Sequence, residues 1–335
     1  MKIVVLDSNI WLSELALMSP LGCAFSHYIV VSDIKIGLPE IIEIETKYNL
    51  RKHLIDYREN IRKDYNRMLA ILGQMKEIVM PEDEVIDKKI ENIFDFHKDR
   101  LIRIPFDVEG AKSSFDKIVK KLPPNKDKDQ QFKDGVIWAN CLKLAEQGDV
   151  SLVTEDKAFY KNRDYSQGLA TNLLEEANKA HHSVTIFSEL ALVIDKVKSN
   201  LGLDKQRLIK TIENNTYSQI LEFANNKDFE IIGIVSSNFE FYATTNPVEV
   251  SVKSNIKYNL ENKSSDQRTD GIIESKAEFI LNIKNYDIRG FIKDGEYLSW
   301  KDENGELKQN KSTYGYLNSI LGHRTIEHKI SYKIE

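Results

Sequence analysis

Short apolar runs alternate with segments of helical hydrophobic spacing in the N-terminal part of the chain. The run at 2–6 is uninterrupted after its first residue, which is typical of a strand buried on both faces of a parallel sheet. The runs 150–153 and 184–187 have the same character, and helical spacing occupies 134–147 and 188–199. This alternation predicts a parallel α/β sheet with helices packed on its faces.

Between the first strand and Pro123, the pattern predicts a second strand and a helix, followed by an insertion made of helices. An extended stretch lies within 28–36, and Pro39 fits the first turn of the helix that follows. We expect the helical insertion to occupy about 50–122 and a turn-rich loop to begin at Pro123. Its helical segments are 51–75, 82–97 and 107–122.

A different pattern begins near Gly202. A helix over 204–225 leads into β-branched, aromatic and alternating segments, with a turn signal at 302–305. We therefore predict a first domain at 1–199 and a smaller α+β domain at 200–335. The polar stretch 261–270 predicts an exposed loop. The expected strands of the second domain are 229–235, 240–243, 248–252, 272–283, 288–292 and 326–334.

The composition is that of a globular protein large enough for two cores. The chain has 335 residues, of which 41% are hydrophobic and 30% are charged. Its apolar runs are too short for a membrane span, and we expect no secretory leader. Cys23 and Cys141 have no Cys or His at ligand spacing, which argues against disulfides and zinc and favours a reducing, cytoplasmic setting. The net charge of -5 excludes a histone-like basic coat but not a local basic groove.

Acidic residues follow the predicted strands at one edge of the sheet. Asp7 comes directly after the first strand, Asp156 lies just past the strand 150–153, and Asp134 begins the helix before that strand. The carboxyl ends of parallel strands form ligand-binding crevices. Glu45, on the helix after the second strand, has a helical phase that allows it to point to the same edge, and Glu43 is the competing choice. The pattern predicts a cluster of carboxylates.

The motifs that carry these acids resemble those of the PIN-domain nuclease superfamily. They are, in order, Leu-Asp-Ser-Asn, Leu-Pro-Glu-Ile-Ile-Glu-Ile-Glu, Lys-Asp-Gly-Val-Ile-Trp and Val-Thr-Glu-Asp-Lys-Ala-Phe. The resemblance covers about 1–190 and implies a parallel-sheet PIN-like domain. The Pro-rich stretch before Lys133, together with Trp138, resembles the branch that carries a long helical insertion. We know of no comparable resemblance for 200–335.

The resemblance implies specific roles. It places metal-binding, catalytic acids at Asp7, Glu45, Asp134 and Asp156. Polar residues that support the site fall on Asn9 and Thr154. Glu155 is a departure, because relatives often have a small polar residue there, and this extra carboxylate either joins the site or points to solvent.

The chemistry of such a cluster does not depend on the family name. Carboxylates that repel one another favour a cation between them, and oxygen ligands without His or Cys select Mg²⁺ or Mn²⁺ over zinc. One or two ions would allow phosphodiester hydrolysis. Taken singly, each Asp has an ordinary structural explanation as a helix cap or turn residue, and Glu45 as a solvated helix residue. Their joint placement favours a metal-dependent hydrolase, and the resemblance favours an endoribonuclease that binds RNA over a deoxyribonuclease.

Basic residues near the acids are candidates for holding substrate phosphates. Those that flank the site in sequence are Lys128, Lys133, Lys157, Lys161 and Arg163. A second group, made of Arg51, Arg58 and Arg62, gives the insertion a basic side. Acids interleaved with these arginines favour an ordinary solvated helix face instead.

Two alternatives to a general endoribonuclease stay open. One is a catalytically inactive PIN-like module that binds RNA or a protein partner. The other is a toxin or antiviral-defence nuclease whose C-terminal domain senses a signal, forms homo-oligomers or binds a partner protein.

Overall fold

A five-stranded parallel sheet forms the centre of the N-terminal part of the protein. The strand order is β3-β2-β1-β4-β5, and Leu6 at the end of β1 lies beside Val153 at the end of β4. The apolar residues of β1 and β4 are almost fully buried, as expected for central strands of a parallel sheet. The strands are β1 (Lys2–Leu6), β2 (Ile34–Pro39), β3 (Leu101–Ile104), β4 (Asp149–Val153) and β5 (Val184–Phe187).

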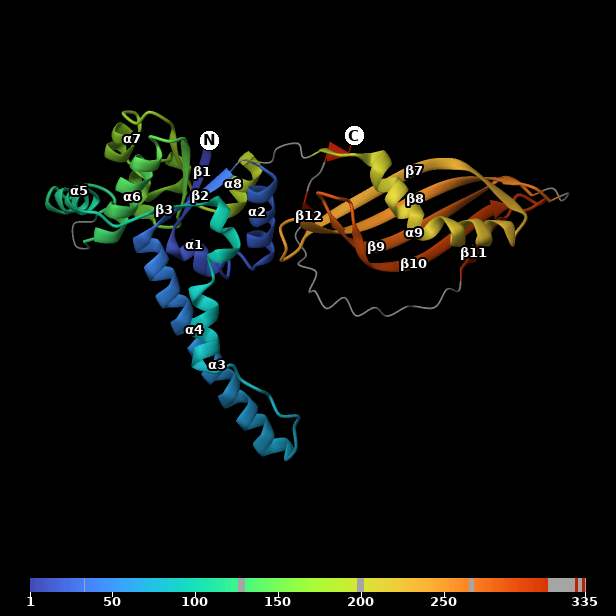
Figure 1. Ribbon diagram of the computed structural model, residues 1–335, viewed down its shortest axis with the longest axis horizontal. Helices are drawn as coiled ribbons and strands as arrows, with labels where there is room; N and C mark the ends of the chain where they lie inside the picture. The colour runs from blue at the N-terminus through green and yellow to red at the C-terminus, as the bar shows by residue number, and fades with distance from the viewer. Residues whose placement is uncertain are drawn as a thin grey trace. The chain divides into compact units, whose positions relative to one another are not determined.

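The computed structural model describes residues 1–32, 34–125, 130–197, 202–264, 268–312, 329–330 and 333–334. The chain divides into two compact units. The first comprises Met1–Phe25 and Ser32–Val197, and the second comprises Ser26–Val31 and Lys198–Glu335. Figure 1 shows the first unit mainly in blue to green and the second in yellow to red.

Helices of the first unit pack on both sides of the strand ladder. Helix α6 packs on β2 and β4, α3 packs on β2, and α8 packs on β4 and β5. The parallel α/β class is therefore confirmed. The helices are α1 (Ser8–Ser13), α2 (Pro20–Val31, whose residues from Ser26 onward belong to the second unit), α3 (Glu40–Leu72), α4 (Asp83–Glu91), α5 (Val108–Val119), α6 (Phe132–Leu144), α7 (Thr171–Ala177) and α8 (Leu190–Val197), with short 3-10 turns η1 (Asp95–Arg100), η2 (Lys157–Phe159), η3 (Lys161–Arg163) and η4 (Tyr165–Gln167).

The segment before β2 differs from the prediction. The chain is helical up to Val31, and the strand begins only at Ile34. Ala24 and Tyr28, one helical turn apart, are both buried, and so are Phe25 and Ile29. Burial at this spacing outweighs the strand preference of the β-branched residues at the end of α2.

The segment predicted as a helical insertion contains a long helix, a shorter one beside it and a strand of the sheet. Helix α3 is continuous over 33 residues and α4 packs beside it, as Figure 1 shows. Strand β3 follows, so the expected insertion at about 50–122 was wrong in including it. Arg51 pairs with Asp87 at 2.6 Å and Arg58 with Asp83 at 2.5 Å. These arginines hold the two helices together, which favours the structural explanation of the basic side.

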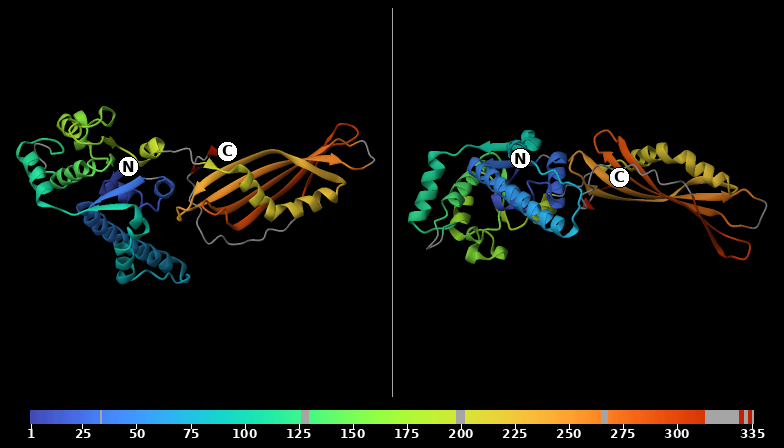
Figure 2. Two further views of the ribbon diagram at one scale, coloured as in Figure 1. Left: turned by 45° about the horizontal axis from the view of Figure 1, so that its top comes forward. Right: turned by 90° about the horizontal axis from the view of Figure 1, so that it is seen from below.

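The second unit is built on an antiparallel sheet. Its order is β11-β10-β9-β8-β7-β12, and α9 (Lys205–Asn225) lies across one face, as Figure 2 shows. Val252 of β8 pairs with Phe241 and Phe279 on its two sides. The strands are β7 (Phe229–Ala243), β8 (Glu249–Asn262), β9 (Gly271–Asn282), β10 (Ile288–Lys301), β11 (Leu307–Lys311) and β12 (Lys329–Ile330), with a separate pair of β6 (Gly202–Leu203) and β13 (Lys333–Ile334).

The α+β class of this unit is confirmed, but its strands are longer than predicted. The segments 229–235 and 240–243 are one strand, and β11 was not expected. Of the predicted strand 326–334, the described residues are 329–330 and 333–334. No helix in the described parts of the chain is long and apolar enough to cross a membrane.

Candidate active site

Asp7 is buried at the point where β1 gives way to α1. Its side chain is 5% exposed. Its Oδ1 accepts a hydrogen bond of 2.7 Å from the Ser8 amide, which caps α1. Its Oδ2 accepts one of 2.7 Å from the hydroxyl of Thr154, which follows β4. Burial raises the pKa of Asp7, the two hydrogen bonds oppose that rise, and the charge of Glu45 adds to it.

Ser8 connects Asp7 to Glu45, a role that the sequence analysis missed. Its hydroxyl lies 3.0 Å from Glu45 Oε2 and 3.3 Å from Asp7 Oδ1. The other carboxylate oxygen of Glu45 pairs with Lys133. Glu43 instead pairs with Lys47 and Arg103, each at 3.2 Å. Of the two competing glutamates, Glu45 is therefore the one beside Asp7.

Asp134 lies in the first turn of α6 and is the least satisfied acid of the group. Gln131, rather than Asp134, occupies the cap position, so a capping role does not explain this residue. Its Oδ2 is buried with no hydrogen-bond partner in the described residues. Burial, followed by the charges of Asp7 and Asp156, raises the pKa of Asp134 to about 8. A buried oxygen of this kind is costly unless a cation or proton satisfies it.

Asp156 is held near Asp134 by the turn that follows β4. Its amide donates to Thr154 Oγ1 at 3.0 Å, and its Oδ1 accepts from the Ala158 amide at 2.7 Å. The side chains of Asp134 and Asp156 also share a hydrogen bond. Thr154 thus orients both Asp7 and Asp156, while its own side chain is fully buried.

A close helix contact positions α6. Ser114 of α5 donates a hydrogen bond of 2.6 Å to the Phe132 carbonyl. A Cβ at Gly135 would lie 2.2 Å from Ser114 Oγ, so only glycine allows α5 to approach here. The Lys-Asp-Gly motif therefore combines an acid with the small residue that lets its helix pack.

The other predicted site residues are dispersed. Asn9 is exposed on α1, Glu155 is exposed, and Lys157 lies over the ring of Tyr165 at 5.2 Å. Lys133 is engaged with Glu45, and Arg163 lines a separate cavity. Lys128 lies outside the described residues.

The four carboxylates suit a hard cation, although several of their oxygens already accept hydrogen bonds from protein groups. Electrostatic interactions connect Asp134 to Asp7 and Asp156, and Asp7 to Glu45. Within the described ranges, no three acidic, His or Cys side chains are gathered closely enough to hold an ion as they stand. Lys133 and Ser8 occupy Glu45, so a bound cation would have to displace at least one of them. The unpartnered Asp134 Oδ2 and the all-carboxylate set fit Mg²⁺ or Mn²⁺.

Comparison with known proteins identifies the N-terminal region. Residues 4–159 match the family model of the PIN domain. This range runs from β1 through the turn after β4 and contains all four acids. No curated protein and no solved structure matches the chain.

Proposed function

We propose that this protein, whose residues 4–159 form a PIN domain, is a metal-dependent endoribonuclease. PIN domains are generally nucleases, so the family supports phosphodiester hydrolysis at a coarse level. We further propose that the enzyme requires Mg²⁺ or Mn²⁺ and prefers RNA to DNA.

The single observation that carries the proposal is the environment of Asp134. Its carboxyl is buried beside Asp7 and Asp156, and one of its oxygens lacks a partner among the described residues. Such an arrangement destabilises the ionised protein unless a cation neutralises it. Grouping these carboxylates lowers the free energy of unfolding, and destabilising clusters of this kind are typical of functional sites.

The proposed roles follow from the contacts of each residue. Asp7, Asp134 and Asp156 would hold Mg²⁺ or Mn²⁺, with Glu45 joining once Lys133 releases it. A bound ion would neutralise the scissile phosphate and lower the pKa of an attacking water. Thr154 and Ser8 keep the carboxylates of Asp7 and its neighbours in position by their hydrogen bonds.

A cleavage assay tests the proposal. Circular RNA and circular single-stranded DNA of the same sequence are incubated with the full chain in Mg²⁺, Mn²⁺ or EDTA. We expect internal cleavage of the RNA in either metal and none in EDTA. Asp134→Asn should abolish cleavage, whereas Asp116→Asn, at an exposed position of α5, should not. Cleavage that persists in EDTA or in Asp134→Asn would overturn the metal-dependent mechanism, and cleavage of DNA alone would overturn the choice of RNA.

A further inference from the structure

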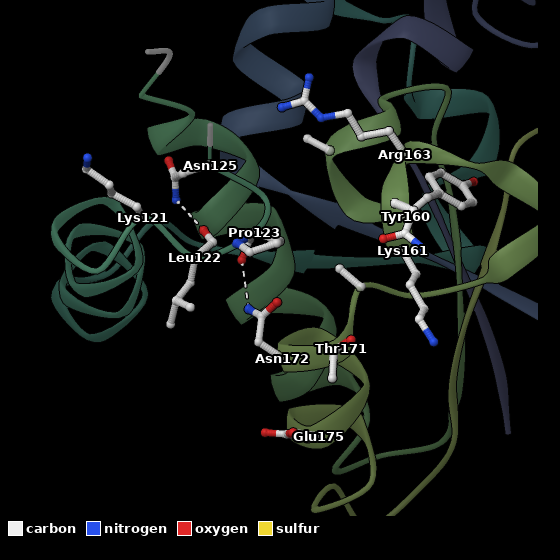
Figure 3. Close-up of a pocket in the computed structure, with 13 residues that line it drawn as sticks. Lys121, Leu122, Pro123, Asn125, Tyr160, Lys161, Arg163, Thr171, Asn172 and Glu175 are labelled. Atoms are coloured by element: carbon white, nitrogen blue, oxygen red, sulfur yellow. Dashed lines mark hydrogen bonds between the residues drawn. The ribbon is translucent and has the colours of Figure 1, made fainter. Parts of the chain in front are cut away.

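A cavity of about 570 Å³ lies beside the proposed active site in the first unit. One wall is the loop between α5 and α6, and the other is the turn at 158–163, with the start of α7 beneath, as Figure 3 shows. The residues with polar or charged side chains that line it are Lys121, Asn125, Tyr160, Lys161, Asn162, Arg163, Thr171, Asn172 and Glu175.

The charge of this cavity suits an anion. Its lining contains three cations, Lys121, Lys161 and Arg163, and one acid, Glu175. In the part of the chain that the structure describes, neither Lys161 nor Arg163 has an ion-pair partner. The cavity between Leu38 and Pro105 differs, because its cations Lys47 and Arg103 are both paired with Glu43. Cations left unpaired in a hollow are available to a ligand.

The backbone holds Arg163 in an unusual conformation at the cavity. Asn162 and Arg163 have φ values of 52° and 60°, and two consecutive left-handed residues other than glycine are unfavourable. Hydrogen bonds of 2.9 Å from the Lys161 amide to Gly168 and of 3.0 Å from the Arg163 amide to Tyr160 keep the turn closed. Strain of this kind concentrates at ligand sites.

Both walls continue directly into the acidic site. Tyr160 donates its hydroxyl to the Thr154 carbonyl at 2.9 Å, and Thr154 in turn binds Asp7. On the other wall, Asn125 Oδ1 accepts from the Gln131 amide at 2.8 Å, immediately before the helix that carries Asp134. The two walls of the cavity are therefore fixed to the segments that carry Asp156 and Asp134.

The apolar part of the lining suits a flat, neutral group. Leu122, Pro123, Ala158 and Ala170 contribute to the walls between the polar side chains. The ligand that combines an anionic group with a flat, largely apolar one is a nucleotide. Its phosphate would meet the cations, and its base would rest on the apolar wall, with Asn172 and Glu175 near its polar edge.

We infer that this cavity binds one nucleotide of a single-stranded substrate, on the side of the acids, and that Arg163 and Lys161, whose side chains point apart in Figure 3, contact the phosphates on either side of that nucleotide. The inference rests on the proposed nuclease function for the identity of the strand as substrate. Binding by the cavity itself does not require that the strand be cleaved.

Binding without metal tests the cavity separately from catalysis. The probe is a fluorescein-labelled ten-nucleotide oligouridylate, titrated with the full chain in EDTA and followed by fluorescence anisotropy. We expect Lys161→Ala and Arg163→Ala each to weaken binding roughly fivefold. The matched control is Lys2→Ala, because Lys2 is exposed at the opposite end of β1 from Asp7. It should bind as the wild type does.

The salt dependence distinguishes a direct interaction with phosphate from a structural effect. Each phosphate of a single strand that a variant no longer neutralises should reduce the slope of log K against log salt by about 0.7. Thermal melting of the variants checks that they fold. The double variant Lys161→Ala, Arg163→Ala completes the series. If it folds, binds as tightly as the wild type and keeps the wild-type salt slope, the inference is overturned.

The outcomes separate the two proposals. Loss of oligouridylate binding in the double variant, together with no cleavage by the wild type, would support the cavity and overturn the nuclease. Metal-dependent cleavage by the wild type, together with unchanged binding by the double variant, would support the nuclease and overturn the cavity. Saturation by adenosine monophosphate without any binding of oligouridylate would overturn the assignment to a strand.

Discussion

The hydroxyl of Thr154 donates a hydrogen bond of 2.7 Å to Asp7 Oδ2, although the two residues are 147 positions apart in the chain. Each residue follows one of two neighbouring strands, and Leu6 pairs with Val153 directly before them. The same hydroxyl oxygen accepts from the Asp156 amide at 3.0 Å. Thr154 therefore links the carboxylate of Asp7 to the backbone of Asp156 and fixes the turn that carries the second acid.

Replacing Asp134 by Asn should stabilise the protein in the absence of metal. The raised pKa of Asp134, about 8, means that the folded protein keeps a proton that the unfolded chain releases near its ordinary value of 3.8. Its contribution to the free energy of unfolding is thus fully present below pH 4 and is lost as the pH rises toward 8, by on the order of 1 kcal/mol per pH unit. Urea denaturation in EDTA at pH 5 to 8 should show Asp134→Asn gaining on the wild type as the pH rises. If the difference in free energy of unfolding between Asp134→Asn and the wild type stays constant from pH 5 to 8, the pKa of Asp134 is not raised.

Asp7→Asn should abolish cleavage but stabilise the protein less than Asp134→Asn does. Both oxygens of Asp7 accept hydrogen bonds, and an amide would turn an NH₂ group toward Ser8 or Thr154. The relief of repulsion is therefore offset by about 1–3 kcal/mol for a broken or unsatisfied hydrogen bond. Thermal melting in EDTA compares the two variants. A higher melting temperature for Asp7→Asn than for Asp134→Asn would contradict the prediction.

Mn²⁺ should raise the melting temperature, and the rise should be larger at pH 8 than at pH 6. An ion that binds only the folded state stabilises it by about 2.7 kcal/mol at a hundred times its dissociation constant. At pH 6 the ion must displace the proton held by Asp134. Differential scanning fluorimetry with Mn²⁺ and with EDTA checks this, and Asp134→Asn, as the control, should lose most of the shift.

Lys133→Ala should tighten Mn²⁺ binding, by up to about fivefold. Lys133 pairs with Glu45 and is half exposed, so its removal frees a carboxylate at a cost of at most about 1 kcal/mol. Isothermal titration calorimetry measures the change. Lys133→Arg keeps the charge and should bind Mn²⁺ as the wild type does, whereas weaker binding by Lys133→Ala would show that the amine supports the site.

Gly135→Ala should destabilise the protein by about 1–3 kcal/mol, because the new methyl group would overlap Ser114. Urea denaturation of the full chain measures this. Combining it with Ser114→Gly removes the overlapping side chain but also the hydrogen bond to Phe132, so it should recover only part of the loss. A single variant as stable as the wild type would mean that α5 does not restrain α6 at this point.

Much of the first unit could be predicted from local patterns. The strands β1, β4 and β5 are short, mainly apolar runs, and Asp7 and Asp156 come just after two of them. Strand direction in a parallel sheet then brings these acids to one edge, whatever the details of packing. The strand β3 was missed because its residues are only partly buried, and the helix α2 was missed because its apolar residues lie close together and include several that favour strands.

What the sequence determined by itself is the set of acidic residues and the edge of the sheet where they lie, since both depend on residue type and chain direction. The tertiary structure alone decided which glutamate joins Asp7, because Glu43 and Glu45 differ by about 200° around a helix and only packing chooses the face that meets the sheet. It also decided that Ser8 bridges two carboxylates and that Arg51 and Arg58 pair with α4. The sequence marked Lys161 and Arg163 as cations that flank the acids, but it did not predict the cavity that they line, because its two walls come from segments that meet only when the chain folds.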